Sequence, residues 1–322
     1  MREEGQAGAR DACRRVLEEA ADLRPLWQAY RNGSAPLARA LQLLPAVRRG
    51  GGAVPALRAI RLDLERDGAP VGGGAFERFL IVAGALTAVE RVPQLAVDES
   101  VKALFYRKFV RYATGAAGEP FDLDRASFVA ASNIATLTRF PAGQLDWVVS
   151  GLPRSWLWRV RRGDLPRLLR VVAIELGGFA PAFFSHLDAT RPNQGMLLER
   201  ESLRSYHRMG RAMERQPAIK GLITASWFHS PDTFIVSPHL AWTNEVFVQN
   251  GGHVFRLGAV DPRCGVLHRS PERQRAYEEG TFTPTEALVI WPRQAMLMWA
   301  ANRRDLAESP GPRQAWPAGA RA

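Results

Sequence analysis

The chain has 322 residues, 46% of them hydrophobic and 23% charged, so it can bury a sizeable core and is not a disordered protein. Its formal net charge of +11 comes almost entirely from arginine, and its two cysteines are too few for a disulfide framework or a cysteine-based zinc site. The N-terminus is charged throughout, and the longest apolar run, residues 79–89, is shorter than the ~20 residues of a bilayer-spanning helix, so we expect a soluble, cytoplasmic protein.

Helical periodicity dominates the first half of the sequence. Apolar residues recur at helical spacing in residues 16–30, 37–47, 57–64, 76–89 and 101–112, with Asn-Gly, Gly-rich or Asp-Gly breaks after the first three. The segment 76–89 is apolar on most faces, which predicts a buried helix.

We expect the helical pattern to continue over residues 124–187, with breaks at its prolines. Asp164 followed by Pro166 is typical of a helix start, because the carboxylate accepts a backbone N–H and proline has none to leave unsatisfied. The sequence therefore predicts one helical region for residues 1–190.

The pattern changes after residue 190, where strands and helices alternate. The expected elements are a helix at 201–215, strands at 221–228, 253–258 and 287–293, and helices at 239–250, 271–280 and 294–304. We predict an α+β fold in which a helical N-terminal region (1–190) packs on a mixed α/β sheet unit (191–305). Residues 306–322, rich in Pro, Gly and Ala, are expected to form a disordered tail.

Polar residues gather on the loop between the strand at 221–228 and the next helix. They are His229, Ser230, Asp232, Ser237 and His239. Ligand sites of α/β sheets collect where strands end and helices begin, because free backbone N–H groups and the positive helix end point there. We expect Ser237 to cap the helix and both histidines to face an open cavity.

Asn244 in the expected helix and Asn250-Gly251-Gly252 in the turn after it carry a resemblance to the C-terminal half of the GNAT-type N-acyltransferase superfamily. There, a strand, an Asn-containing helix, a Gly-bearing turn and another strand form the part of the fold where the acyl thioester of coenzyme A lies. Residues 207–212, HRMGRA, are similar to the superfamily's pyrophosphate loop and place His207 and Gly210 at the cofactor. The resemblance implies transfer of an acyl group from acyl-CoA, or from an acyl carrier protein thioester, to an amine.

The resemblance also implies roles for individual residues. A strand N–H near Ala225 or Ser226 would polarise the thioester carbonyl, His229 or His239 would take the amine proton, and Tyr277 would protonate the leaving thiolate. The predicted site further includes Ser237 as a catalytic residue and Asn244 and Arg293 as cofactor-binding residues.

A second hypothesis is an oxygenase that uses Fe(II) and 2-oxoglutarate. His186-Leu187-Asp188 has the His-x-Asp form of such iron sites, in which two histidines and one carboxylate hold the metal. His253 lies downstream as the third ligand, and Arg263 follows it at a spacing that resembles the co-substrate arginine of those enzymes.

A third hypothesis is a non-catalytic protein that binds an acidic partner. Two tryptophans and five arginines lie within residues 156–170, a composition that can neutralise phosphates and stack bases. We rank nucleic acid below an acidic protein as the partner. The arginines are spread through every segment, which is also what a compositional bias produces.

Overall fold

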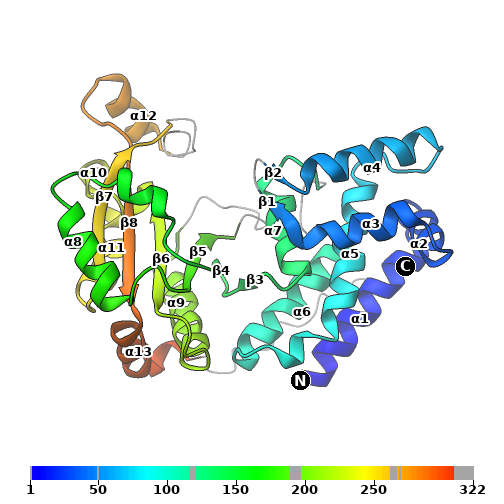
Figure 1. The fold of residues 1–322 in the computed structure, drawn as a ribbon, viewed down its shortest axis with the longest axis horizontal. Coiled ribbons are helices and arrows are strands. Elements are labelled where there is room, and N and C mark those ends of the chain that lie inside the picture. The colour runs from blue at the N-terminus through cyan, green and yellow to red at the C-terminus, as the bar shows by residue number, and fades with distance from the viewer. Residues whose placement is uncertain are drawn as a thin grey trace.

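The computed structural model of the protein describes residues 2–48, 51–115, 121–188, 197–261, 267 and 270–307, and two lobes are visible in it (Figure 1). The helical lobe comprises α1 (Arg2–Glu19), α2 (Arg24–Arg31), α3 (Ala35–Leu43), α4 (Val54–Arg66), α5 (Ala75–Val89), α6 (Glu99–Ala113) and α7 (Ala126–Ala135), with 3-10 turns η1 (Leu44–Ala46) and η2 (Val92–Gln94). A short hairpin of β1 (Val47–Arg48) and β2 (Gly51–Gly52) also belongs to it.

The sheet lobe is built on a six-stranded mixed sheet. Its strands are β3 (Arg139–Pro141), β4 (Leu145–Ser150), β5 (Ala182–Leu187), β6 (Gly221–Ser226), β7 (His253–Ala259) and β8 (Thr285–Pro292). Their spatial order is β3-β4-β5-β6-β8-β7. Only β5 and β6 run parallel among these neighbours, and helix α9 (Glu199–Glu214) lies between them in the chain.

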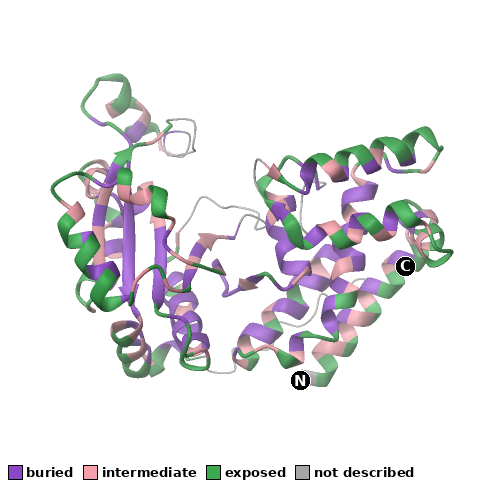
Figure 2. Ribbon diagram, in the orientation of Figure 1, coloured by how far each residue is buried: buried purple, intermediate pink, exposed green. Residues whose placement is uncertain are grey.

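Helices cover both faces of the sheet. One face packs on η3 (Arg154–Trp158), α8 (Leu165–Arg170) and the π-helical turn η4 (Val171–Glu175), and its core includes Leu168, Ile223 and Phe255. The other face carries Leu222 and Trp291 and packs on α9, α11 (Trp242–Val248) and α13 (Arg293–Asn302). Figure 2 shows the central strands as the most continuously buried part of this lobe.

The remaining elements of the sheet lobe are short. They are η5 (Trp227–His229), α10 (Pro231–Val236), η6 (Pro238–Leu240), α12 (Pro271–Glu278) and η8 (Arg304–Leu306). The predicted stop at Asn250-Gly251-Gly252 is confirmed: Gly251 has φ 76°, and the N–H of Gly252 donates to the carbonyl of Phe247 at 2.7 Å.

Two of the helices predicted for the helical lobe, at 76–89 and 57–64, are confirmed. The segment 76–89 is a buried helix, because most side chains around α5 are enclosed by the neighbouring helices. The segment 57–64 falls in α4. The segment 37–47, expected as one helix, is divided, because α3 ends at Leu43, η1 follows, and Val47 begins β1. The segment 16–30, expected as one helix, is instead two, since α1 ends at Glu19 and α2 starts at Arg24.

The expectation of helix throughout residues 124–187 is wrong, because β3, β4 and β5 lie within it. In β4, three consecutive residues, Leu145, Asp146 and Trp147, are buried. A strand covered on both faces shows no polar alternation, so periodicity does not distinguish it from a helix. These strands pair with β6 in one sheet, which therefore extends across the expected boundary at residue 190.

The single helix expected at 239–250 is also wrong, because η6 and α11 divide it. Residues 308–322 of the expected tail lie outside the described residues. Among the described residues, no helix combines the length and the apolar composition that crossing a bilayer requires.

Candidate functional site

The parallel strands β5 and β6 stop pairing halfway along their length. Each has six residues, but only Phe183 with Leu222 and Phe184 with Ile223 are paired. Beyond these pairs, β5 remains bonded to β4 and β6 to β8. Alternate residues of a strand direct their N–H and C=O groups toward its neighbour, so some backbone groups of residues 185–187 and 224–226 have no partner on the other strand; we call this unpaired stretch the strand gap.

A cavity of about 220 Å³ lies at the end of this gap. Leu187 ends β5, and Trp227 and Phe228 directly follow β6, so the ends of the two diverging strands form part of its wall. The other lining residues are Leu197, His239, Leu240, Ser270, Pro271, Glu272 and Arg273. The cavity is therefore apolar on the strand side and polar at the start of α12.

Arg273 is the buried cation of this cavity and is 4% exposed. Its guanidinium lies 4.8 Å from the centre of the Trp227 ring, and its Nη1 donates to Ser237 Oγ at 2.9 Å. The hydroxyl of Ser237 caps no helix in the structure, because the arginine of α12 engages it instead. The sequence does not single out Arg273, since it is one arginine among many and its position depends on the packing of α12.

The two histidines of the corner lie in opposite environments. His239 is exposed on η6 and lines the cavity. His229 is fully buried, and its Nδ1 donates to the carbonyl of Thr243 at 3.2 Å. Burial lowers the pKa of His229 to about 3, so its imidazole is neutral and shielded from ligands. Only His239 has the open position that the sequence predicted for both.

Other residues of the predicted site surround this corner. Ser226, half-buried, ends β6 opposite Ala287 at the mouth of the gap. Asn244 is buried and holds the loop in place, because its Nδ2 donates to the carbonyl of His229 at 2.7 Å. Tyr277 lies on α12 one helical turn from Arg273 and is 39% exposed.

Ser230 and Asp232 form a partly buried hydrogen-bond chain with Thr285 of β8. The Ser230 and Thr285 hydroxyls are 2.5 Å apart, and Thr285 donates to Asp232 Oδ2 at 2.7 Å. The Ser230 hydroxyl also accepts the N–H of Asp232 and caps α10. These polar residues fix the loop after β6 to the neighbouring strand.

The expected pyrophosphate-loop residues lie inside α9. His207 is 8% exposed, and burial is the main cause that lowers its pKa. A Cβ added to Gly210 would come within 2.7 Å of the Ala300 Cβ, so α9 and α13 are in close contact there. N–H groups within a helix bond to carbonyls one turn back and are not available to a phosphate.

Arg293 closes the end of the same helix. Its Nη1 donates to the carbonyls of Met213, Gln216 and Ile219 at 2.7, 3.0 and 3.0 Å. Carbonyls at a helix end have no partner within the helix, and a guanidinium satisfies them. Arg293, which the sequence suggested as a cofactor-binding residue, thus connects the end of α9 to α13.

The three candidate iron ligands do not come together. His186 and Asp188 lie at the end of β5, while His253 lies on β7, three strand positions away, or about 14 Å at ~4.8 Å per strand. Asp188 is paired with Lys108 Nζ at 2.7 Å, and His253 with Glu175 at 2.9 Å. Across the described residues, no three His, Cys, Asp or Glu side chains are grouped to hold a metal.

The Arg- and Trp-rich segment lies on one face of the sheet. Trp158 is 87% exposed, whereas Trp156 packs against Phe184, and Arg159 pairs with Glu286 at 2.7 Å. Asp164 does not cap α8 as expected, because its Oδ2 accepts the N–H of Arg256 on β7.

No known protein family, curated protein or solved structure matches the chain.

Proposed function

We propose that this protein transfers an acyl group from a thioester of coenzyme A or of an acyl carrier protein to an amine. The observation that carries the proposal is the gap between β5 and β6, with a cavity at its open end. Backbone groups at the inner edges of two diverging strands can pair with an extended, amide-bearing ligand as they would with an added strand. The pantetheine arm common to both thioester donors is such a chain.

The residues at the open end suit acyl transfer. In the proposed reaction, the amine loses a proton to His239, and its nitrogen attacks the thioester carbonyl carbon. A backbone N–H near Ala225 or Ser226 stabilises the oxyanion. The C–N bond forms, the C–S bond breaks, and the proton taken from the amine ends on the sulfur of the released thiol.

Two further features support this scheme. The guanidinium of Arg273, next to the cavity, favours a leaving thiolate, because a cation stabilises the negative charge that develops on sulfur. The chain runs from β6 through η5, α10 and η6 to the Asn244-bearing helix α11, the turn at Gly251 and β7, an order that is compatible with the strand, helix, turn and strand of the resemblance to the GNAT superfamily.

The test is amide formation by the purified full-length chain. Acetyl-CoA and longer acyl-CoA thioesters are incubated with a panel of primary amines, and the product is measured by mass spectrometry. We expect His239→Ala to lower kcat about 10²- to 10⁴-fold with a small change in KM, because the base acts in the chemical step.

His253→Ala is the matched control, because this histidine lies on β7 and contacts Glu175 instead of the cavity. Its activity should stay near that of the wild type. If no thioester yields an amide and coenzyme A does not raise the melting temperature, the proposal is wrong. Equal activity of His239→Ala and wild type would show that His239 is not the base.

A further inference from the structure

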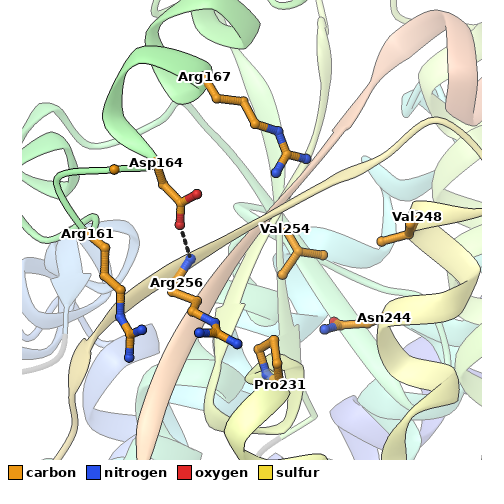
Figure 3. Close-up of a pocket in the computed structure, with 9 residues that line it drawn as sticks. Arg161, Asp164, Arg167, Pro231, Asn244, Val248, Val254 and Arg256 are labelled. Carbon is orange, nitrogen blue, oxygen red and sulfur yellow. Dashed lines mark hydrogen bonds between the residues drawn. The ribbon is translucent and has the colours of Figure 1, made fainter.

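A second opening, which we call the arginine cleft, lies over the edge strand β7 and has a volume of about 540 Å³. On one side, Arg161 and Arg167 come from the segment around α8, and Arg256 comes from β7 (Figure 3). On the other side, the cleft is lined by residues of α10 and α11. Its lining residues are Arg161, Gly163, Asp164, Arg167, Pro231, Asn244, Val248, Val254 and Arg256. None of them lines the cavity at the strand gap.

The backbone of this cleft is fixed. The N–H of Arg256 donates to Asp164 Oδ2 at 3.3 Å, and its carbonyl accepts the N–H of Arg161 at 3.0 Å. The loop around residues 161–164 thus covers the edge of β7 at this point and holds the Arg161 and Arg256 side chains side by side. The two arginines are positioned by hydrogen bonds that leave their guanidinium groups available.

Two of the guanidinium groups share one carboxylate in long ion pairs. Arg161 and Arg256 lie 3.8 and 3.9 Å from the carboxylate of Asp232, whereas a charge-assisted hydrogen bond is about 2.8 Å long. The guanidinium of Arg167 lies over the Phe255 ring at 5.0 Å. Within the part of the chain that the structure describes, none of the three guanidinium groups donates a hydrogen bond.

Both nearby carboxylates accept hydrogen bonds from groups other than the three guanidinium groups. Asp164 accepts a backbone N–H, and Asp232 accepts the hydroxyl hydrogen of Thr285 at 2.7 Å. Three cations around one opening therefore present several unused N–H donors. Such a set of guanidinium groups matches the oxygens of a phosphate, which accept paired N–H bonds.

We propose that the arginine cleft binds the phosphate group of a small organic phosphate. The volume is within the range of small-molecule sites, about 300–1,000 Å³. Pro231, Val248 and Val254 give the cleft an apolar side next to the cations, so the ligand carries an apolar body beside its phosphate. This site is independent of the proposed acyl transfer, because the two openings share no lining residue.

The experiment titrates the full-length protein with inorganic phosphate and with phenyl phosphate at constant ionic strength, by calorimetry and thermal shift. Phenyl phosphate should bind more tightly than inorganic phosphate, because its ring contacts the apolar side. Arg161→Gln and Arg167→Gln should each weaken phenyl phosphate binding about tenfold or more.

The chain offers closely matched controls. Arg162 neighbours Arg161, and Arg170 lies on α8 with Arg167; both are exposed, and neither lines the cleft. Arg162→Gln and Arg170→Gln remove the same charge. The affinity of these two variants for phenyl phosphate should stay within about twofold of the wild type, since distant exposed charges are screened. Equal weakening by all four variants would indicate general charge attraction and overturn the site.

Two other outcomes also overturn the proposal. Benzoate binding as tightly as phenyl phosphate would show that the cleft does not select phosphate. Unchanged phenyl phosphate affinity in the Arg161→Gln/Arg167→Gln double variant, with the native melting temperature retained, would place any phosphate binding outside the cleft.

Discussion

His229 shows how a single imidazole is held neutral inside this fold. The rings of Phe228 and Phe247 lie 4.5 and 5.5 Å from it, and its Nδ1 hydrogen is used by the carbonyl of Thr243. Burial opposes protonation, because a charged imidazole would lose its hydration and gain no anionic partner. The structure therefore assigns His229 to the packing of the loop that carries Ser237 and His239.

This environment predicts a pH dependence of stability. The pKa of His229 falls from 6.5 to about 3 on folding, so between these values the unfolded chain binds a proton that the folded chain does not. The fold thus loses stability as pH falls below about 6.5, by roughly 1.4 kcal/mol per unit. The variant His229→Gln has no such titration, so the difference in unfolding free energy between wild type and variant should narrow by about 2 kcal/mol from pH 7 to pH 5.

Urea unfolding at both pH values measures this difference. His253→Gln serves as the control, because its imidazole is partly exposed and pairs with Glu175. The ring of His253 keeps its contact with water in the folded chain, so the difference for this variant should not narrow as it does for His229→Gln. If the unfolding free energies of wild type and His229→Gln differ by the same amount at pH 7 and pH 5, His229 is not held buried and neutral.

At the scale of elements, predictability depends on how many faces of an element are covered. The helices of the first lobe have one apolar stripe or, in α5, an apolar surface bounded by Arg78 and Glu90, and both patterns are readable in the sequence. Strands β6, β7 and β8 were also predictable, because β-branched residues and glycine stops outline them. Strands β3 to β5 are short or covered on both faces, so their pattern is ambiguous.

The candidate site was predictable to a smaller extent. The end of β6 follows from strand and turn signals, and His239 does line a cavity. Arg273 and Leu187 line the cavity because α12 and β5 lie next to the end of β6. These segments are far apart in the sequence, and the sequence does not indicate that they meet. Likewise, the burial of His229 depends on Phe247 of α11, which the loop sequence does not specify.

The contact between α9 and α13 predicts the effect of a change at Gly210. Alanine usually stabilises a helix by about 1 kcal/mol relative to glycine. Here the added Cβ would come 2.7 Å from the Ala300 Cβ, so the helices must separate. We expect Gly210→Ala to lower the free energy of unfolding by about 1–3 kcal/mol, as overpacking does.

Removing the opposing methyl group should reverse this loss. In the double variant Gly210→Ala/Ala300→Gly, the methyl group has changed helices and the space is restored, so the double variant should be more stable than Gly210→Ala. Chemical denaturation of the four proteins of the cycle gives the coupling energy. Additive effects would show that the two helices are not in contact at this point.

At the scale of the whole molecule, the helical lobe and the sheet share one core. Phe105 of α6 contacts Phe140 of β3, which stacks on Trp147 of β4, and this ring in turn contacts Phe183 of β5. One apolar cluster therefore extends from α1 to α13. Buried charges accompany it: Lys108 of α6 lies 2.7 Å from Asp188 and 3.7 Å from Asp146.

Lys108 should therefore be the cation on which the junction of the two lobes depends. The side chains of Asp146 and Asp188 are 0% and 2% exposed, and removal of the lysine leaves two buried carboxylates close together, with Arg139 still paired to Asp146. Burial and the charge of Asp188 both raise the pKa of Asp146, whereas Lys108 lowers it. We expect Lys108→Met to lower the free energy of unfolding by about 3–5 kcal/mol.

Lys102→Met is the matched control on the same helix. Lys102 is as buried as Lys108, but its partner Glu99, at 3.1 Å, is 58% exposed and remains hydrated when the lysine is removed. This variant should lose about 1 kcal/mol or slightly more, since it also gives up the bond to the carbonyl of Pro93. Similar losses in the two variants, measured by urea unfolding at pH 7, would show that the buried carboxylates do not depend on Lys108.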